Sequence, residues 1–155
     1  MRKSRAKKRI LSPDPRFNDT MITRFANNLM YDGKKSAALT TLYEAIDIVS
    51  QKTEQDGLQV WRKALENVMP SVEVKSRRVG GSNFQIPQEI RPDRRVSMGM
   101  KWMISYARQR NEKSMGQKLA AEIIAASKEE GASFKKKEDV HKMAEANKAY
   151  SHFRV

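Results

Sequence analysis

The chain has 155 residues, of which 31 are lysine or arginine and 18 are aspartate or glutamate, so its formal net charge is +13 at pH 7. An excess of this size indicates a polyanionic partner. A chain of this length predicts a single main domain that buries roughly 68–70% of the surface exposed by its unfolded form.

The composition also excludes several classes of protein. Cysteine is absent, which excludes disulfides and thiolate metal sites and fits a reducing, cytoplasmic location. The sequence contains no run of 18 apolar residues that could span a bilayer, so we expect no membrane partner. The basic N-terminus leads into a proline-containing segment rather than an apolar one, which argues against a signal peptide.

The N-terminal segment is the most basic part of the chain. It contains no acidic residue and six cations in nine positions, and we expect it to be a disordered tail in the free protein. Residues 10–18 contain two prolines and predict an extended strap. We therefore divide the chain into a basic arm and strap, 1–18, and a helical domain, 19–155. The cations of the tail are Arg2, Lys3, Arg5, Lys7, Lys8 and Arg9.

Three helices follow in the sequence pattern. Asp19 or Thr20 can cap a helix over about 20–32, for which Gly33 is a plausible stop. Apolar residues keep the helical period through a second helix, about 35–52. A third helix contains Trp61 and cannot continue through Pro70.

Residues 72–90 change to the pattern of a β-hairpin. Two short strand-like segments flank the turn sequence Gly80-Gly81-Ser82-Asn83. Pro87 lacks an amide donor, so its strand should be an edge, and a two-stranded ribbon consists only of edges. The hairpin should therefore project from the helical body.

Three more helices complete the prediction. Pro92 suits the first turn of the fourth helix, and the apolar spacing predicts a fifth that ends near Gly131. Val140, Met143 and Ala144 mark the sixth. The predicted fold class is mainly α: a six-helix, bundle-like domain with a protruding β-hairpin arm and a disordered basic N-terminal tail.

The candidate binding residues are cations on protruding segments. The tail is the first cluster, and six like charges in nine residues repel one another unless a polyanion is bound. A second cluster runs from the hairpin into the fourth helix, where only Glu89 and Asp93 oppose it. A third surrounds the junction of the fourth and fifth helices. The second contains Lys75, Arg77, Arg78, Arg91, Arg94 and Arg95, and the third Arg108, Arg110, Lys113 and Lys118.

Two further features allow a binding or a purely structural interpretation. Gly80 and Gly81 would let the backbone approach a phosphate or sugar, but they would equally permit the positive φ of a hairpin turn. Lys34-Lys35 and Lys135-Lys136-Lys137 each sit near a predicted helix start, where unpaired amides attract phosphate. A tight bend on a solvated face would explain these lysines nearly as well.

Enzymatic chemistry has little support in this sequence. His141 and His152 are expected to be surface groups, because no carboxylate set accompanies them as metal ligands. The acidic residues lack the pairing that acid–base or two-metal catalysis needs, and no glycine-rich phosphate loop precedes a helix. We therefore expect no catalytic residue, metal, cofactor or small-molecule substrate.

Three segments carry a resemblance to a known family. They are Asp32-Gly33-Lys34-Lys35, Ser76-Arg77-Arg78-Val79-Gly80-Gly81, and the run from Lys136 to Asn147. Together they closely resemble small-subunit ribosomal protein seven of bacteria, in register over nearly the whole chain. The family's fold, a six-helix domain with a protruding β-arm, is also what the sequence pattern predicts.

The resemblance implies a function on the ribosome. It implies direct binding to a helical junction of the small-subunit ribosomal RNA, nucleation of head assembly, and a place at the subunit interface near the exit-site tRNA. Arg2 to Arg9 and Lys75 to Arg78 would clamp RNA, supported by Arg94, Arg95 and the residues near Met115. The hairpin tip and C-terminal helix would face the tRNA and neighbouring small-subunit proteins, numbers nine and eleven.

Two alternatives are carried beside this interpretation. A DNA-bending architectural protein would also use basic β-ribbons, although such proteins usually dimerise to present two arms. A metal-free nuclease or RNA-modifying enzyme would need a catalytic constellation that the sequence does not offer.

Overall fold

The computed structural model describes residues 9–153, so the tail cations from Arg2 to Lys8 lie outside the described residues. Within the described range the chain forms six α-helices, a two-stranded hairpin and a terminal 3-10 helix. It divides into two compact units, one up to Thr40 and one from Thr41 onward. The helix α2, Lys35–Thr53, crosses this boundary.

In the N-terminal unit, the strap is more folded than expected. Its backbone makes a turn at residues 15–17. The buried Asp14 carboxylate stabilises this turn, because Oδ2 accepts hydrogen bonds from the amides of Arg16, at 3.0 Å, and Phe17, at 2.9 Å. The Thr23 hydroxyl also donates to the carbonyl of Ser12 at 2.9 Å.

The helix α1, Thr20–Leu29, begins where the sequence predicted and ends earlier. The Asp19 side chain caps it by accepting from the amide of Met21 at 2.8 Å. Its last residue is Leu29 rather than residue 32, because Met30 already has extended backbone angles. Gly33 lies beyond the helix, in the connection to α2.

The second unit contains a helical core. The helices are α3, Gly57–Val68; α4, Pro92–Arg108; α5, Met115–Ser127; and α6, Ala132–Ala146. Asp56 caps α3 and Ser114 caps α5, while Pro92 opens α4. The helix α3 packs against α4 and α5, which also contact each other. The fully buried side chains of this core include Trp61, Met100, Met103, Leu119 and Ile123.

The hairpin has the predicted position and turn. Strands β1, Val72–Val79, and β2, Ser82–Glu89, pair antiparallel, with Val79 opposite Ser82. Gly80 and Gly81 have φ values of +57° and +88°, so both central residues adopt the positive φ that a type I′ turn requires. Pro87 pairs with Val74 in a sheet of two edge strands.

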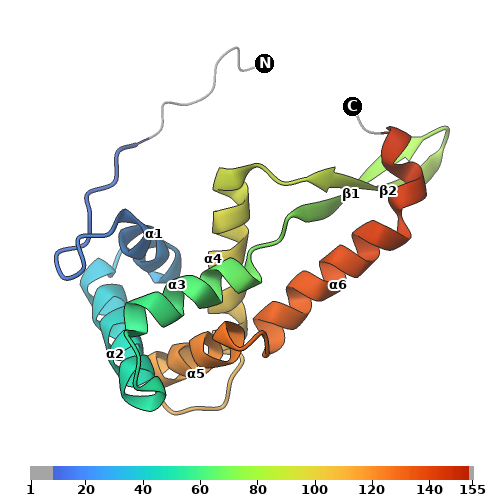
Figure 1. Ribbon diagram of the computed structural model, residues 1–155. Helices are drawn as coiled ribbons and strands as arrows, with labels where there is room; N and C mark the ends of the chain where they lie inside the picture. The colour runs from blue at the N-terminus through green and yellow to red at the C-terminus, as the bar shows by residue number, and fades with distance from the viewer. Residues whose placement is uncertain (1–8, 154–155) are drawn as a thin grey trace. The chain divides into compact units, whose positions relative to one another are not determined.

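The hairpin is supported along its length by the C-terminal segment. The helix α6 contacts both strands, and the 3-10 helix η1, Lys148–Phe153, contacts β2 (Figure 1). The rings of Phe84 and Tyr150 meet at a centroid distance of 5.2 Å, and Ile86 is only 1% exposed. The arm, by which we mean residues 72–90, is therefore packed on one side rather than wholly projecting.

The helix α6 differs from its prediction in two details. Met143 is 42% exposed, although its spacing predicted a core position. The helix starts at Ala132, so Lys135 to Lys137 lie a full turn inside it rather than at its start. The amide of Ser133 in that first turn already has a partner, since it donates to Glu122.

Candidate RNA-binding surface

Basic residues gather along the arm and at its base. Arg77 and Arg78 are exposed near the turn and, as successive strand residues, point to opposite faces. Lys75 lies closer to the base, where Arg91 and Arg94 come from the segment that enters α4. Lys75, Arg91 and Arg94 line one open cavity of about 720 Å³. The tertiary structure thus joins the two halves of the second predicted cluster.

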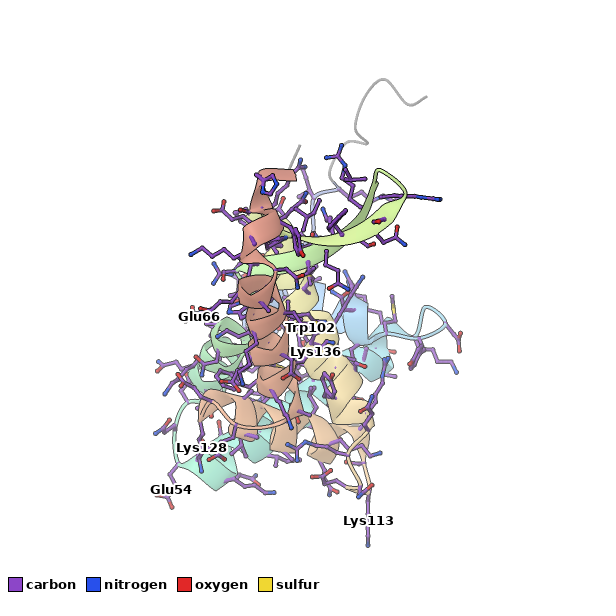
Figure 2. All side chains as sticks on the ribbon, turned by 90° about the vertical axis from the view of Figure 1, so that its right-hand side faces the viewer. Glu54, Glu66, Trp102, Lys113, Lys128 and Lys136 are labelled. Atoms are coloured by element: carbon purple, nitrogen blue, oxygen red, sulfur yellow. The ribbon has the colours of Figure 1, made fainter. Side chains whose placement is uncertain are left out.

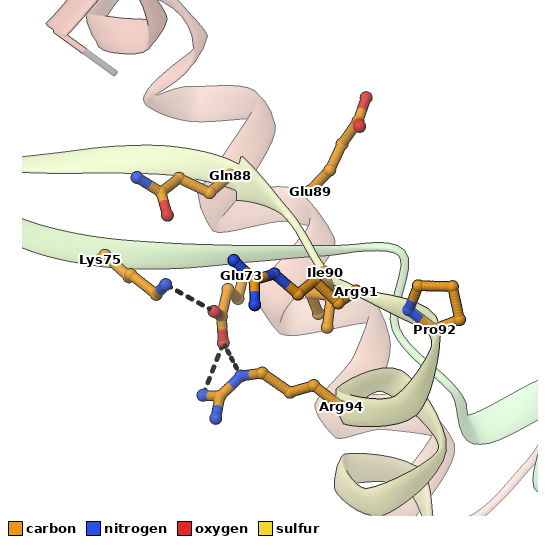
Figure 3. Close-up of a pocket in the computed structure, with 8 residues that line it drawn as sticks. All are labelled: Glu73, Lys75, Gln88, Glu89, Ile90, Arg91, Pro92 and Arg94. Carbon is orange, nitrogen blue, oxygen red and sulfur yellow. Dashed lines mark hydrogen bonds and ion pairs between the residues drawn. The ribbon is translucent and has the colours of Figure 1, made fainter. Parts of the chain in front are cut away.

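A buried acid lies inside this cluster, and the sequence interpretation missed it. Glu73 is only 7% exposed, and its carboxylate contacts Lys75 and Arg94 (Figure 3). Glu89, which was expected to oppose these cations, is exposed and points away from them in the same view. Glu73 and Lys75 are two residues apart on one strand, so their contact could have been predicted, whereas the contact with Arg94 could not.

The cations around Glu73 control its ionisation. Burial of the carboxylate raises its pKa, but hydrogen bonds and positive charge from Arg94 and Lys75 outweigh burial. The net effect lowers the pKa of Glu73 below its ordinary value. The carboxylate is therefore ionised at neutral pH and holds both cations beside it.

In the third predicted cluster, two of the cations donate hydrogen bonds to other groups of the protein. The Arg110 Nε atom donates to the buried Glu122 carboxylate at 2.7 Å, and the Lys118 ammonium donates to the Arg108 carbonyl at 3.4 Å. Met115, the first residue of α5, is half-buried. Lys113 is exposed and extends away from the helices of its unit (Figure 2).

Lysines 135–137 do not act as one group. Lys135 is exposed and Lys136 is half-buried. The Lys137 ammonium donates to the Asn67 carbonyl at 2.7 Å and lies 5.0 Å from the centre of the Phe134 ring. Lys137 therefore joins α6 to α3.

The remaining candidates within residues 9–153 are exposed. Arg95 lies in the first turns of α4, and Gly80 and Gly81 form the tip of the arm. Arg9, Lys34 and Lys35 belong to the N-terminal unit. A second set of cations, absent from the sequence prediction, lines a cavity of about 590 Å³ beside α3 and α5: Lys52, Lys63 and Lys128. These three lysines are far apart in the sequence, so no local pattern indicated that they lie together.

His141, expected to be a surface group, is only partly exposed and has a partner within the protein. It is half-buried, and its Nε2 atom accepts a hydrogen bond from the Ser71 amide at 3.1 Å, at the base of the arm. Burial and the positive charges of Lys137 and Arg95 lower the pKa of His141. Among residues 9–153, no set of three histidine or acidic side chains is placed to hold a metal ion.

None of the helices in the described range is both long and apolar enough to cross a bilayer. The arm instead offers exposed Lys75, Arg77 and Arg78 on a thin two-stranded element, and the buried Glu73 carboxylate holds Lys75 beside Arg94 of α4. Such an arrangement suits phosphate and sugar contacts to a folded nucleic acid.

Comparison with known proteins shows the family of this chain. Residues 1–148 match the family described as "Ribosomal protein S7p/S5e". The chain is 66% identical to the small ribosomal subunit protein uS7 of Flavobacterium johnsoniae over 157 aligned residues, which cover 99% of each chain. It is 64% identical to uS7 of Cytophaga hutchinsonii over 99% of each chain, and 60% identical to uS7 of Amoebophilus asiaticus over the full length of both. These matches give no support to the DNA-bending alternative.

Proposed function

Because this chain belongs to the ribosomal protein S7p/S5e family, it is a non-enzymatic component of the small ribosomal subunit, and we propose that its arm and the start of α4 together form the RNA-binding surface. The residues proposed to contact small-subunit ribosomal RNA are Lys75, Arg77 and Arg78, together with Arg91, Arg94 and Arg95. The basic tail and the exposed lysines of the other clusters would extend this surface.

One observation carries the proposal most directly. Cations from the arm and from the start of α4 line the same cavity, and two of them are held by a shared carboxylate. Charges that only keep a surface soluble do not have to be held at fixed positions. Cations at fixed positions can match the phosphates of a folded RNA, whose backbone geometry differs from that of a regular duplex.

We further propose that binding nucleates assembly of the head of the small subunit. The arm tip and η1 would face the exit-site tRNA and neighbouring small-subunit proteins, for which numbers nine and eleven are the candidates. The contact between η1 and β2 supports a shared face for these partners, because it brings the C-terminal segment against the strand that leaves the arm tip. Tyr150 is 38% exposed there, and tyrosine is enriched at protein interfaces.

The test compares two triple variants that lose the same charge. Lys75, Arg77 and Arg78 are replaced by glutamine in one variant, and Lys52, Lys63 and Lys128 in the other. Binding to a transcript of the small-subunit ribosomal RNA junction is measured at several salt concentrations. The arm variant should lose about tenfold or more in affinity, with a salt slope smaller by about 2–3 because fewer counterions are released.

The control variant should bind almost as the native chain does. Equal losses in the two variants would show that only net charge matters and that the arm is not the binding surface. Equal affinity of the native chain for the junction transcript and for random duplex RNA would overturn specific recognition altogether.

A further inference from the structure

An acidic side chain lies at the centre of a surface whose other charged members are mostly basic. Glu73 projects from β1 and uses both carboxylate oxygens. Its Oε1 atom lies 3.2 Å from the Lys75 ammonium. Its Oε2 atom accepts from Arg94 Nε at 3.1 Å and from Arg94 Nη2 at 2.9 Å (Figure 3).

This geometry fixes two long side chains that would otherwise move. The side chains of Lys75 and Arg94 are 55% and 58% exposed, whereas that of Glu73 is 10% exposed. Ordering a long cation on binding costs side-chain conformational entropy. The buried carboxylate meets part of this cost before RNA arrives, because both cations are already held on the protein.

The contacts with Glu73 also leave donors for a ligand. A guanidinium carries five N–H groups, and Arg94 directs two of them to Glu73. An arginine held through Nε and one terminal nitrogen presents its other N–H groups outward. Planar, fixed donors of this kind suit phosphate oxygens better than a freely rotating side chain does.

We propose that Glu73 is a positioning residue for RNA binding: its carboxylate holds Lys75 and Arg94 where they contact phosphates of the RNA. This inference rests on the proposed function of the arm. It predicts a change in RNA affinity that is opposite in sign to the change expected from net charge alone. Removing the negative charge of Glu73 should weaken binding to the cognate RNA, although the net charge of the chain would become more positive.

Glu89 provides the matched control for this prediction. It is also an arm glutamate at the edge of the same cavity, but its carboxylate points away from Glu73, Lys75 and Arg94. Glu89→Gln changes the net charge by the same amount as Glu73→Gln. It should leave the two cations in place, so its cognate affinity should equal or slightly exceed that of the native chain.

The experiment measures affinity for the junction transcript and for random duplex RNA at a temperature where each variant is folded by circular dichroism. Glu73→Gln should bind the transcript about three- to tenfold more weakly, and random duplex RNA no more weakly, than the native chain. A purely structural defect would instead lower both affinities in parallel.

A double-mutant comparison tests whether Glu73 acts through Arg94. The variant that carries both Glu73→Gln and Arg94→Gln should bind the transcript little more weakly than Arg94→Gln alone. Full additivity of the two losses would contradict action through Arg94. If Glu73→Gln does not fold, Arg94→Lys replaces it, because lysine keeps the charge and loses the double contact; native affinity of that variant would overturn the inference.

The outcomes separate the two proposals. If the native chain recognises the transcript but Glu73→Gln binds it as tightly as Glu89→Gln does, the positioning role is wrong and the proposed function stands. If the native chain does not prefer the transcript to random duplex RNA, the proposed function itself fails.

Discussion

The Ser71 amide donates to the Nε2 atom of His141 across 70 residues of sequence, at a distance of 3.1 Å. Ser71 lies at the base of the arm, where its carbonyl also accepts from the Ile90 amide at 3.1 Å. His141 thus attaches α6 to the point from which the arm leaves the helical body. Because Nε2 accepts a hydrogen bond, this contact requires the neutral form of the ring.

The contact predicts a dependence of stability on pH. The folded-state pKa of His141 lies below its ordinary value of 6.5, owing to burial and the charges of Lys137 and Arg95. Between these two pKa values the unfolded chain binds more protons, so stability rises with pH in that window and is constant above it. The contribution of His141 is therefore present above about pH 6.5 and is lost as pH falls through the folded-state pKa.

The measurement is the difference in Tm between the native chain and His141→Gln at pH 7.5 and at pH 5. We expect the native chain to have the higher Tm at pH 7.5 and its advantage to shrink at pH 5. His152→Gln, which changes an exposed histidine, is the control. A difference that does not vary with pH would contradict the requirement for a neutral ring.

Glu122 should be among the most sensitive positions for stability. Its carboxylate is 1% exposed and accepts from the Ser133 amide at 3.0 Å, the Ser133 hydroxyl and Arg110 Nε. Glu122→Ala leaves these donors without an acceptor and should lower the free energy of unfolding by about 3–5 kcal/mol, measured by urea denaturation. Glu130→Ala, at an exposed site nearby in sequence, should change it by less than about 0.5 kcal/mol; similar small effects at both sites would refute the prediction.

The contact between Phe84 and Tyr150 should couple the arm to η1. The ring centroids are 5.2 Å apart with an interplanar angle of 54°, a tilted arrangement typical of attractive aromatic pairs. A double-mutant cycle with Phe84→Ala and Tyr150→Ala should give a coupling free energy of about 0.5–1.5 kcal/mol. Tyr150→Phe, which keeps the ring, should preserve most of the stability; strictly additive losses in the cycle would argue against the pair.

Gly99 should not tolerate a side chain, although it lies within a helix. A Cβ atom there would lie 2.9 Å from Met69 Cγ and 3.3 Å from Leu65 Cδ1, so α4 approaches α3 closely at this residue. Alanine gains about 1 kcal/mol in helix propensity over glycine, but overpacking a core typically costs about 1–3 kcal/mol. We expect Gly99→Ala to lower Tm, whereas Ser105→Ala, at an exposed site in α4, should not. A higher Tm for Gly99→Ala would show that Met69 moves aside at little cost.

Much of the fold was predictable from local patterns. The helical period of apolar residues gave all six helices, and Asp19 and Pro92 marked the starts of two. The Gly80-Gly81 sequence predicted the hairpin and the place of its turn, because few other residues adopt positive φ at both turn positions. Errors occurred at element ends and on α6, where Met143 is exposed despite its apolar spacing.

The candidate surface was predictable in composition but not in organisation. Charge counting identified the cations of the arm and of α4 as one cluster, and it overlooked Glu73 among them. The same counting treated Lys137 and Arg110 like the exposed cations, although one donates to the Asn67 carbonyl and the other to Glu122. Sequence periodicity does not show which charged side chain meets an internal partner.

The sequence by itself determined that this protein is a basic, mainly helical chain with a β-arm, because periodicity, turn residues and net charge are local or summed properties. Only the tertiary structure decided which residues contact the arm and its base from other parts of the chain. Glu73 meets Arg94 across 21 residues, and Ser71 meets His141 across 70. Such contacts depend on how helices and strands pack at long range, and packing is settled by the whole set of buried side chains rather than by any one segment.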